Sequence, residues 1–204
     1  TSAQLVSDRI AMDKDERIAK MGERLVRAVD RGVKLCADVL SFSQPENDPP
    51  ETRDVRISLM LGEVTADVLP GFSGRDTPIR FENHVPTDLT VKADPDHTYR
   101  IFLNLFRNAA QAMAKMKESD GARSLIVTAQ KDETIVRISV KDTGPGLPDK
   151  AKANLFKAFA GASGHGSTGL GLTISRELAR DQGGDLILSE TGNNGTAFTV
   201  SFKA

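Results

Sequence analysis

The fold is decided by residues 101–108, Ile-Phe-Leu-Asn-Leu-Phe-Arg-Asn, in which apolar residues alternate with two asparagines. Asn104 and Asn108 lie four residues apart, a spacing that places both amides on the same face of a helix. Residues 109–113 are good helix formers and continue the pattern. A single helical asparagine is usually a solvated residue, but two on one face beside an apolar stripe favour a binding role. We therefore predict a helix over residues 95–117 that carries a functional face.

Composition limits the possible partners. The 204 residues include 27 basic and 28 acidic side chains, a net charge of -1, so we expect neither nucleic acid nor an anionic membrane as a partner. The single cysteine, Cys36, can form no intrachain disulfide, which favours a reducing, cytoplasmic compartment. No apolar run is long enough to span a membrane. Residue 1 is Thr rather than Met, so we expect a segment of a longer protein.

Two domains are predicted. Residues 1–44 have apolar residues spaced three or four apart, which indicates a helical hairpin with a turn near residues 13–15. A helical hairpin cannot fully bury one narrow apolar stripe by itself. A dimeric four-helix bundle would bury it, and the alternative is that the helices pack on the following domain. Residues 45–53 are polar and proline-rich and read as a linker. Residues 54–204 form the second domain.

The second domain mixes helices with hairpins. Asp94 and Pro95 predict an N-cap and first turn for the asparagine-bearing helix. The expected helices cover residues 59–69, 95–117 and 170–181, and residues 148–168 lack a clear period. The expected strands cover residues 55–59, 78–83, 89–93, 124–130, 134–141, 185–190 and 196–202. This pattern predicts an α+β fold, a sandwich with helices on one face of a mixed sheet.

Asp142-Thr143-Gly144-Pro145-Gly146 follows a predicted strand. Its glycines allow the backbone to approach a ligand closely. A carboxylate only accepts hydrogen bonds, so Asp142 suits an exocyclic amine such as that of adenine. The alternative is an ordinary Asp-x-Gly turn.

A second glycine-rich stretch, residues 164–172, opens a predicted helix. Free N–H groups at a helix N-terminus attract phosphates. The stretch lacks the Lys of a Walker loop, and alone it could be a flexible loop with a helix cap. Asn108 could supply an oxygen to Mg²⁺, whose other ligands would be waters and phosphates. A single nucleotide accounts for all three stretches, with its base on Asp142, its metal on Asn108 and its phosphates on residues 166–171.

The order of these motifs resembles the N, G1, F, G2 and G3 boxes of sensor histidine kinases. The boxes correspond to residues 103–109, 142–146, 155–159, 169–172 and 195–196. The resemblance covers residues 54–204, and residues 1–44 are more loosely similar to the end of the first helix and the whole second helix of the family's dimerisation domain.

The resemblance implies a Bergerat ATP-binding fold with ATP and Mg²⁺ as cofactors. It implies Mg²⁺ on Asn108, adenine on Asp142, and Thr196 near the adenine through water. It also implies a lid between Leu147 and Thr168. The lid anchors would be Phe156 and Phe159, and the catalytic candidates Asn104 and Asn108. The nucleotide-binding candidates are Asn104, Asn108, Asp142, Gly144, Gly146, Leu147, Thr168, Gly169, Leu170, Gly171, Leu172 and Thr196.

The implied function is transfer of the ATP γ-phosphoryl group to a histidine on the kinase's own dimer, from which a response regulator receiver domain takes it. Related gyrase and MutL ATPases place a Glu general base where this chain has Asn104. An amide cannot accept that proton, so we expect slow ATP hydrolysis. The alternatives are a phosphotransfer scaffold that no longer binds ATP, a GHKL-type ATPase switch, and a serine kinase on the same fold.

The chain also departs from the family pattern. Residues 1–44 contain no histidine, so we expect the phosphoacceptor upstream of Thr1 and a chain that cannot label itself. The three histidines are predicted to be surface residues: His84, His97 and His165. Gln111 replaces the usual Lys and Thr143 the usual Asn. After Lys152, only Lys157 and His165 remain as lid cations, which predicts weak phosphate neutralisation.

Overall fold

The structure is a computed structural model that describes residues 50–72, 78–117, 119, 121–159 and 169–204, with eight further positions between residues 18 and 33. The chain divides into two compact units, Thr1–Pro45 and Glu46–Ala204. In the first unit the eight described positions are helical, and their apolar side chains are exposed. The rest of the predicted hairpin, its turn and residues 45–49 of the linker lie outside the described residues.

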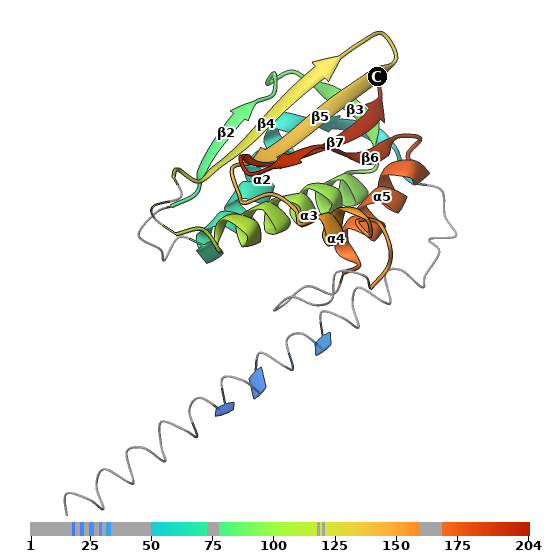
Figure 1. The fold of residues 1–204 in the computed structure, drawn as a ribbon. Coiled ribbons are helices and arrows are strands. Elements are labelled where there is room, and N and C mark those ends of the chain that lie inside the picture. Colours follow the sequence, from blue (N-terminus) through green and yellow to red (C-terminus); the bar gives the residue numbers. More distant parts are fainter. Residues whose placement is uncertain are drawn as a thin grey trace, which may run out of the picture. The chain divides into compact units, whose positions relative to one another are not determined.

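A five-stranded mixed sheet forms one layer of the second unit. Its strands in spatial order are β2 (Arg80–His84), β4 (Ser124–Lys131), β5 (Ile135–Asp142), β7 (Gly195–Lys203) and β6 (Asp185–Gly192). The β2–β4 pair is parallel and the other pairs are antiparallel. The principal helices are α2 (Ile57–Val68), α3 (Pro95–Met113) and α5 (Gly171–Asp181). Figure 1 shows all three on one face of the sheet, which confirms the predicted fold class.

The core lies between these layers. Alternate residues of β5 point inward, and Ile138 is fully buried there. On α3, Phe106 packs at 5.7 Å from Phe81 of β2, and Phe102 lies 6.4 Å from Phe202 of β7, measured between ring centres. Buried aromatic contacts of this kind hold α3 against the sheet.

The N-terminus of α3 is capped as predicted. The Asp94 carboxylate accepts the backbone N–H groups of Asp96 at 2.9 Å and His97 at 3.0 Å, and Pro95 occupies the first turn. These bonds satisfy two of the N–H groups that a helix start leaves unpaired. The helix ends at Met113, four residues before the predicted end at residue 117.

The start of the second unit differs from the prediction. Residues 57–59 belong to α2 rather than to a strand, because Ile57, Leu61 and Val64 bury one helical stripe against the core. The preceding strand is β1 (Arg53–Arg56), which pairs antiparallel with β3 (Thr90–Ala93) in a separate two-stranded sheet. That pairing was not predicted.

Two smaller features also differ from expectation. A short helix, α4 (Asp149–Lys152), lies in the stretch that showed no period. His97 was predicted to lie on the surface and is only 5% exposed, because its position on α3 faces the core. His84 is exposed as predicted, and His165 lies outside the described residues.

None of the helices that the structure describes has the length and apolar character needed to cross a membrane.

Candidate functional site

Asp142 is the last residue of β5 and pairs in register with Thr196 of β7. Both residues are buried, and only 6% of the Asp142 surface is exposed. The Asp142 carboxylate accepts the Gly144 N–H at 2.7 Å. Burial raises the pKa of Asp142, and hydrogen bonds from the backbone of Gly144 and Thr196 offset only part of that rise. A ligand that donates a further hydrogen bond would therefore stabilise the ionised carboxylate.

Glycines allow the turn after β5 to lie directly against the β6–β7 hairpin. Gly146 has φ +78°, and a Cβ there would lie 2.1 Å from the Gly192 carbonyl oxygen. Gly195 has φ +120°, and a Cβ there would lie 1.8 Å from the Asp142 carbonyl oxygen. Only glycine fits such close backbone contacts. The two glycines thus fix the position of Asp142 relative to the hairpin.

A pair of threonines extends this group. The Leu147 N–H donates to Thr191 Oγ1 at 2.9 Å, and Thr191 Oγ1 lies 3.2 Å from Thr196 Oγ1. Sequence reasoning missed Thr191. In the structure Thr191 pairs with Thr196 across the β6–β7 hairpin, and its place next to the predicted turn at residues 192–195 was the signal that could have identified it.

Helix α3 carries the two asparagines. Asn104 Nδ2 donates to Ser175 Oγ at 3.1 Å and to the Gly171 carbonyl oxygen at 3.4 Å, so this amide faces α5. Ser175 is fully buried and was also missed from the sequence, where nothing distinguished it from an ordinary helical serine. Asn108 is half-buried one turn later, and its side chain makes no hydrogen bond to any residue that the structure describes. Its amide oxygen is thus available to a ligand.

The end of the second glycine-rich stretch leads into α5. Gly169 has φ +72°, Leu170 is fully buried, and Gly171 begins the helix, followed by the half-buried Leu172. Among the residues that the structure describes, no side chain caps the N-terminus of α5, and a helix N-terminus is a favourable place for an anion. Thr168 and the rest of this stretch lie outside the described residues.

The two candidate anchors differ. Phe156 packs against the core, and the Arg176 guanidinium carbon lies 4.4 Å from its ring centre. Phe159 is 52% exposed and has φ +63°. Among the nearby cations, Lys152 is paired with Asp149 at 3.0 Å and Lys157 is exposed.

These groups meet around the C-terminal half of α3. A Cβ on Gly144 would lie 3.3 Å from Ala112 Cβ, so the turn that bears Asp142 packs one turn beyond Asn108. Asn104, on the preceding turn, reaches α5. Three groups therefore lie along α3: the buried Asp142 carboxylate, the Asn108 amide, which has no hydrogen-bond partner among the described residues, and the N-terminus of α5. No three His, Cys, Asp or Glu side chains within the described part of the chain gather to hold a metal ion.

Comparison with known proteins gives one family. The family model described as "Histidine kinase-, DNA gyrase B-, and HSP90-like ATPase" matches residues 93–204. The chain is 32% identical to the sensor protein FixL of Bradyrhizobium diazoefficiens over 197 residues, which cover 96% of this chain and 38% of FixL. It is 34% identical to the sensor protein VanS of Enterococcus faecium over 152 residues, which cover 71% of this chain and 36% of VanS.

Solved structures agree with these matches. Full-length ShkA in complex with AMPPNP has a TM-score of 0.70 and 28% sequence identity, covering 86% of this chain and 36% of ShkA. The catalytic domain of the histidine kinase ThkA has a TM-score of 0.62 and 25% identity, covering 75% of this chain and 95% of that domain. The chain thus corresponds to only part of the longer proteins that it resembles.

Proposed function

Because the chain belongs to the histidine kinase-, DNA gyrase B- and HSP90-like ATPase family, with the GHKL-type catalytic domain of a sensor histidine kinase, we propose that it binds Mg–ATP for phosphoryl transfer to histidine. The acceptor would lie on a dimerisation domain, and a response regulator receiver domain would take the phosphoryl group from it. The observation that carries the proposal is the buried Asp142 carboxylate, whose turn packs against α3 at Ala112, one helical turn beyond Asn108.

Asp142 would recognise the base. Its carboxylate is buried and only accepts hydrogen bonds, which suits the exocyclic amine of adenine. Thr196 lies next to Asp142, and its hydroxyl is close to that of Thr191, so a water bridged to adenine has polar partners there. The same site would disfavour a base that presents an oxygen at this position, because two acceptors would then face each other.

The phosphate end would lie between α3 and the N-terminus of α5. The N-terminus of α5, which begins at Gly171, carries the positive end of the helix dipole and suits phosphate oxygens. The Asn108 oxygen fits Mg²⁺, which takes oxygen ligands and keeps waters and phosphates as the others. When bound, magnesium would neutralise charge on the phosphates. The candidate lid between Leu147 and Thr168 remains a prediction beyond Phe159.

Asn104 would restrict the reaction to transfer. Its amide is bonded to Ser175 and Gly171, and an amide cannot serve as the general base for an attacking water. Slow hydrolysis would preserve the γ-phosphoryl group for the histidine acceptor. Residues 1–44 contain no histidine, so this chain should bind nucleotide without labelling itself.

The N-terminal residues would form the dimer. We propose a helical hairpin over residues 1–44, a linker over residues 45–53 and the catalytic domain over residues 54–204. The exposed apolar positions that support a homodimer are Ile18, Met21, Leu25, Val26, Val29 and Val33. A second copy that covers this stripe would remove it from water. A cytoplasmic location would fit the single cysteine and the ATP requirement.

The test is calorimetric titration of the chain with ADP and ATP, with and without Mg²⁺. We expect binding that Mg²⁺ strengthens. Asn108→Ala should abolish the Mg²⁺ effect, and Asp142→Asn should weaken binding under both conditions. Gln130→Ala and Asp88→Asn change an exposed amide and an exposed carboxylate, and both variants should bind like the unaltered chain. A folded sample that binds neither nucleotide would contradict the proposal and favour a phosphotransfer scaffold.

A further inference from the structure

Arg176 in the middle of α5 covers the face of Phe156. Its guanidinium carbon lies 4.4 Å from the centre of the ring. A cation within about 6 Å of an aromatic centre is attracted by the ring's electrons. The Arg176 side chain is only partly exposed and Phe156 packs against the core, so the contact is shielded from water on one side.

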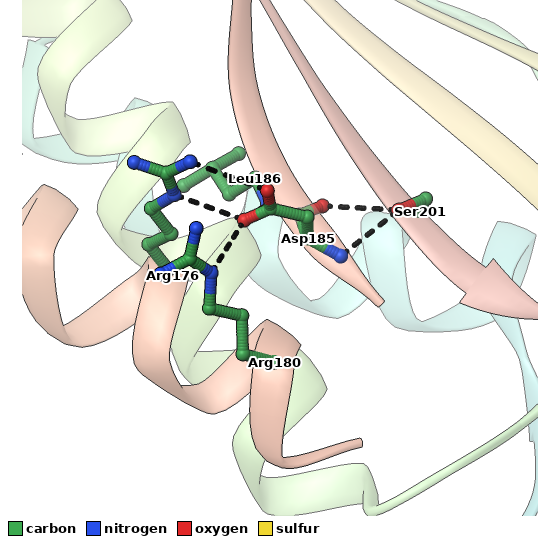
Figure 2. A network of polar contacts seen from close by, with 5 residues as sticks. All are labelled: Arg176, Arg180, Asp185, Leu186 and Ser201. Atoms are coloured by element: carbon green, nitrogen blue, oxygen red, sulfur yellow. Dashed lines mark hydrogen bonds and ion pairs between the residues drawn. The ribbon is translucent and has the colours of Figure 1, made fainter. Parts of the chain in front are cut away.

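Asp185 at the start of β6 sets the direction of this guanidinium. Arg176 Nε donates to one carboxylate oxygen at 2.9 Å and Nη2 donates to the other at 3.2 Å, as Figure 2 shows. Two such bonds fix the plane of the guanidinium as well as its position. Arg180, one turn later, also donates to this carboxylate through Nε at 3.1 Å.

The carboxylate is itself fastened to the sheet. The Asp185 N–H donates to Ser201 Oγ at 2.9 Å, and the Leu186 N–H donates to the Asp185 carboxylate at 2.9 Å. The bonds from Arg176 are the main reason that the pKa of Asp185 falls to about 2, so the carboxylate is ionised at neutral pH. An ion pair this exposed contributes little to stability. Its clearer consequence is a fixed position for the guanidinium.

The Phe156 contact holds the segment that leads away from the proposed base end of the site. The segment that bears Phe156 begins at Leu147, whose N–H is bonded to Thr191 beside Thr196 and the base end of the site. Arg176 holds the same segment at a second point. The two attachments define where residues 147–156 lie relative to the site.

The helix that carries Arg176 begins at the proposed phosphate end of the site. Helix α5 begins at Gly171, whose carbonyl oxygen accepts the Asn104 amide of α3. The Arg176–Phe156 contact therefore joins the segment that starts at the base end to the helix that starts at the phosphate end. Sequence reasoning assigned no role to Arg176 or Asp185.

We propose that Arg176, oriented by Asp185, is a positioning residue for nucleotide binding that holds Phe156 and its segment against α5. The inference rests on the proposed function, because it concerns affinity for the same nucleotide. It predicts that removing the cation, or the aromatic face, weakens nucleotide binding although neither residue need touch the nucleotide.

The experiment is a double-mutant cycle read by ADP affinity. Arg176→Met and Phe156→Leu should each weaken ADP binding about two- to fivefold, the range of one exposed cation–π contact. The double variant should be no weaker than the weaker single variant, because both substitutions remove the same contact. Phe156→Tyr keeps the aromatic face and should restore the affinity. Arg180→Met is the matched control, since Arg180 shares the carboxylate and forms no contact with a ring within the described part of the chain.

A spectroscopic readout separates positioning from general stability. The chain has no tryptophan, so Phe156→Trp would introduce a single indole under Arg176. Its emission should shift when ADP binds, and adding Arg176→Met should change the starting emission and reduce the ADP response. If Arg176→Met does not fold, Arg176→Lys keeps the charge, loses the two-pronged bond and serves in its place.

The outcomes are distinct. An Arg176→Met chain that binds ADP as tightly as the unaltered chain overturns the inference, even if its Tm falls, because the role would then be structural only. Independent losses that multiply in the double variant overturn it as well. If the unaltered chain binds no nucleotide, the proposed function fails, and the inference fails with it.

Discussion

The Asn104 side chain on α3 donates a hydrogen bond across 3.1 Å to the hydroxyl of Ser175, a fully buried residue of α5. The same amide nitrogen lies 3.4 Å from the Gly171 carbonyl oxygen. Both partners of the nitrogen belong to α5, so this helix sets the orientation of the amide. The first candidate catalytic residue is thus coupled to the helix that begins at the proposed phosphate end of the site.

Replacing Ser175 tests this coupling. Ser175→Ala should lower the free energy of unfolding by about 1 kcal/mol, the usual contribution of one hydrogen bond, and should weaken ADP binding slightly because the Asn104 amide can then rotate. Urea denaturation and calorimetry measure the two effects. Thr173→Val is the control: the buried Thr173 hydroxyl has no hydrogen-bond partner among the described residues, so stability should stay the same or rise. Equal losses in both variants would contradict the coupling.

Two glycines should respond in opposite directions to the same substitution. At Gly195 a Cβ would meet the Asp142 carbonyl oxygen at 1.8 Å with φ at +120°, so Gly195→Ala should destabilise the fold by about 3 kcal/mol or more. At Gly62, within α2, a Cβ would meet nothing within 4 Å, so Gly62→Ala should stabilise by about 0.5–1 kcal/mol. Thermal and urea denaturation provide the comparison. A Gly195→Ala chain as stable as the unaltered one would refute the close approach.

The sequence predicted most of the fold because the relevant signals are local. The Asp94 cap, the apolar stripe of α3 and the alternation in β4 and β5 each lie within a single element. The pairing of β1 with β3 joins two four-residue strands that are distant in sequence. No local pattern specifies such a pairing. Residues 55–59 were predicted as a strand from their local sequence, but Ile57 is fully buried in the structure as part of the apolar face of α2.

The same distinction applies to the site. Asp142 and Asn108 were identifiable because glycines or a second amide accompany them in the sequence. Ser175 and Arg176 acquire their roles from partners on other elements, so nothing in their own neighbourhood marked them. Residues of this kind become recognisable only when the helices and strands are placed together.

Asp185 gives a pH prediction. Its pKa is lowered to about 2, chiefly by the hydrogen bonds from Arg176, from an ordinary value of 3.8. A lowered folded-state pKa means that the stabilisation is complete above the unfolded-state value and is lost as the pH falls through about 2. Asp185→Asn should therefore be less stable than the unaltered chain by about 0.2–1 kcal/mol at neutral pH, the range for a partly exposed ion pair. In urea denaturation this difference should shrink below about pH 4; a constant difference would contradict the ionic origin.

The base preference of the site depends on Asp142. The unaltered chain should bind ADP more tightly than inosine diphosphate. Adenine has an amine that donates a hydrogen bond to the carboxylate, whereas inosine has an oxygen at the same position, which cannot donate one. Asp142→Asn should lower ADP affinity about tenfold, as expected for loss of a hydrogen bond to a charged group. The preference for ADP over inosine diphosphate should also narrow. Competition titrations with both nucleotides measure it, and an unchanged preference would place the base elsewhere.

Asp142 also predicts an opposite pH dependence from Asp185. Burial raises the pKa of Asp142 above its ordinary 3.8, so the folded chain holds this proton to higher pH than the unfolded chain does. The associated stability is present below the unfolded-state pKa and is lost as the pH rises through the folded-state pKa. Asn cannot ionise, so the free energy of unfolding of Asp142→Asn minus that of the unaltered chain should increase from about pH 4 to about pH 7.

Urea denaturation without nucleotide, at several pH values in that range, measures the difference. Asp88→Asn changes an exposed aspartate and provides the control, for which the difference should not follow this trend. A difference that decreases with rising pH would mean that the hydrogen bonds from Gly144 and Thr196 outweigh the burial of the carboxylate. The site would then hold its negative charge before any base arrives, and the adenine amine would add little to its stability.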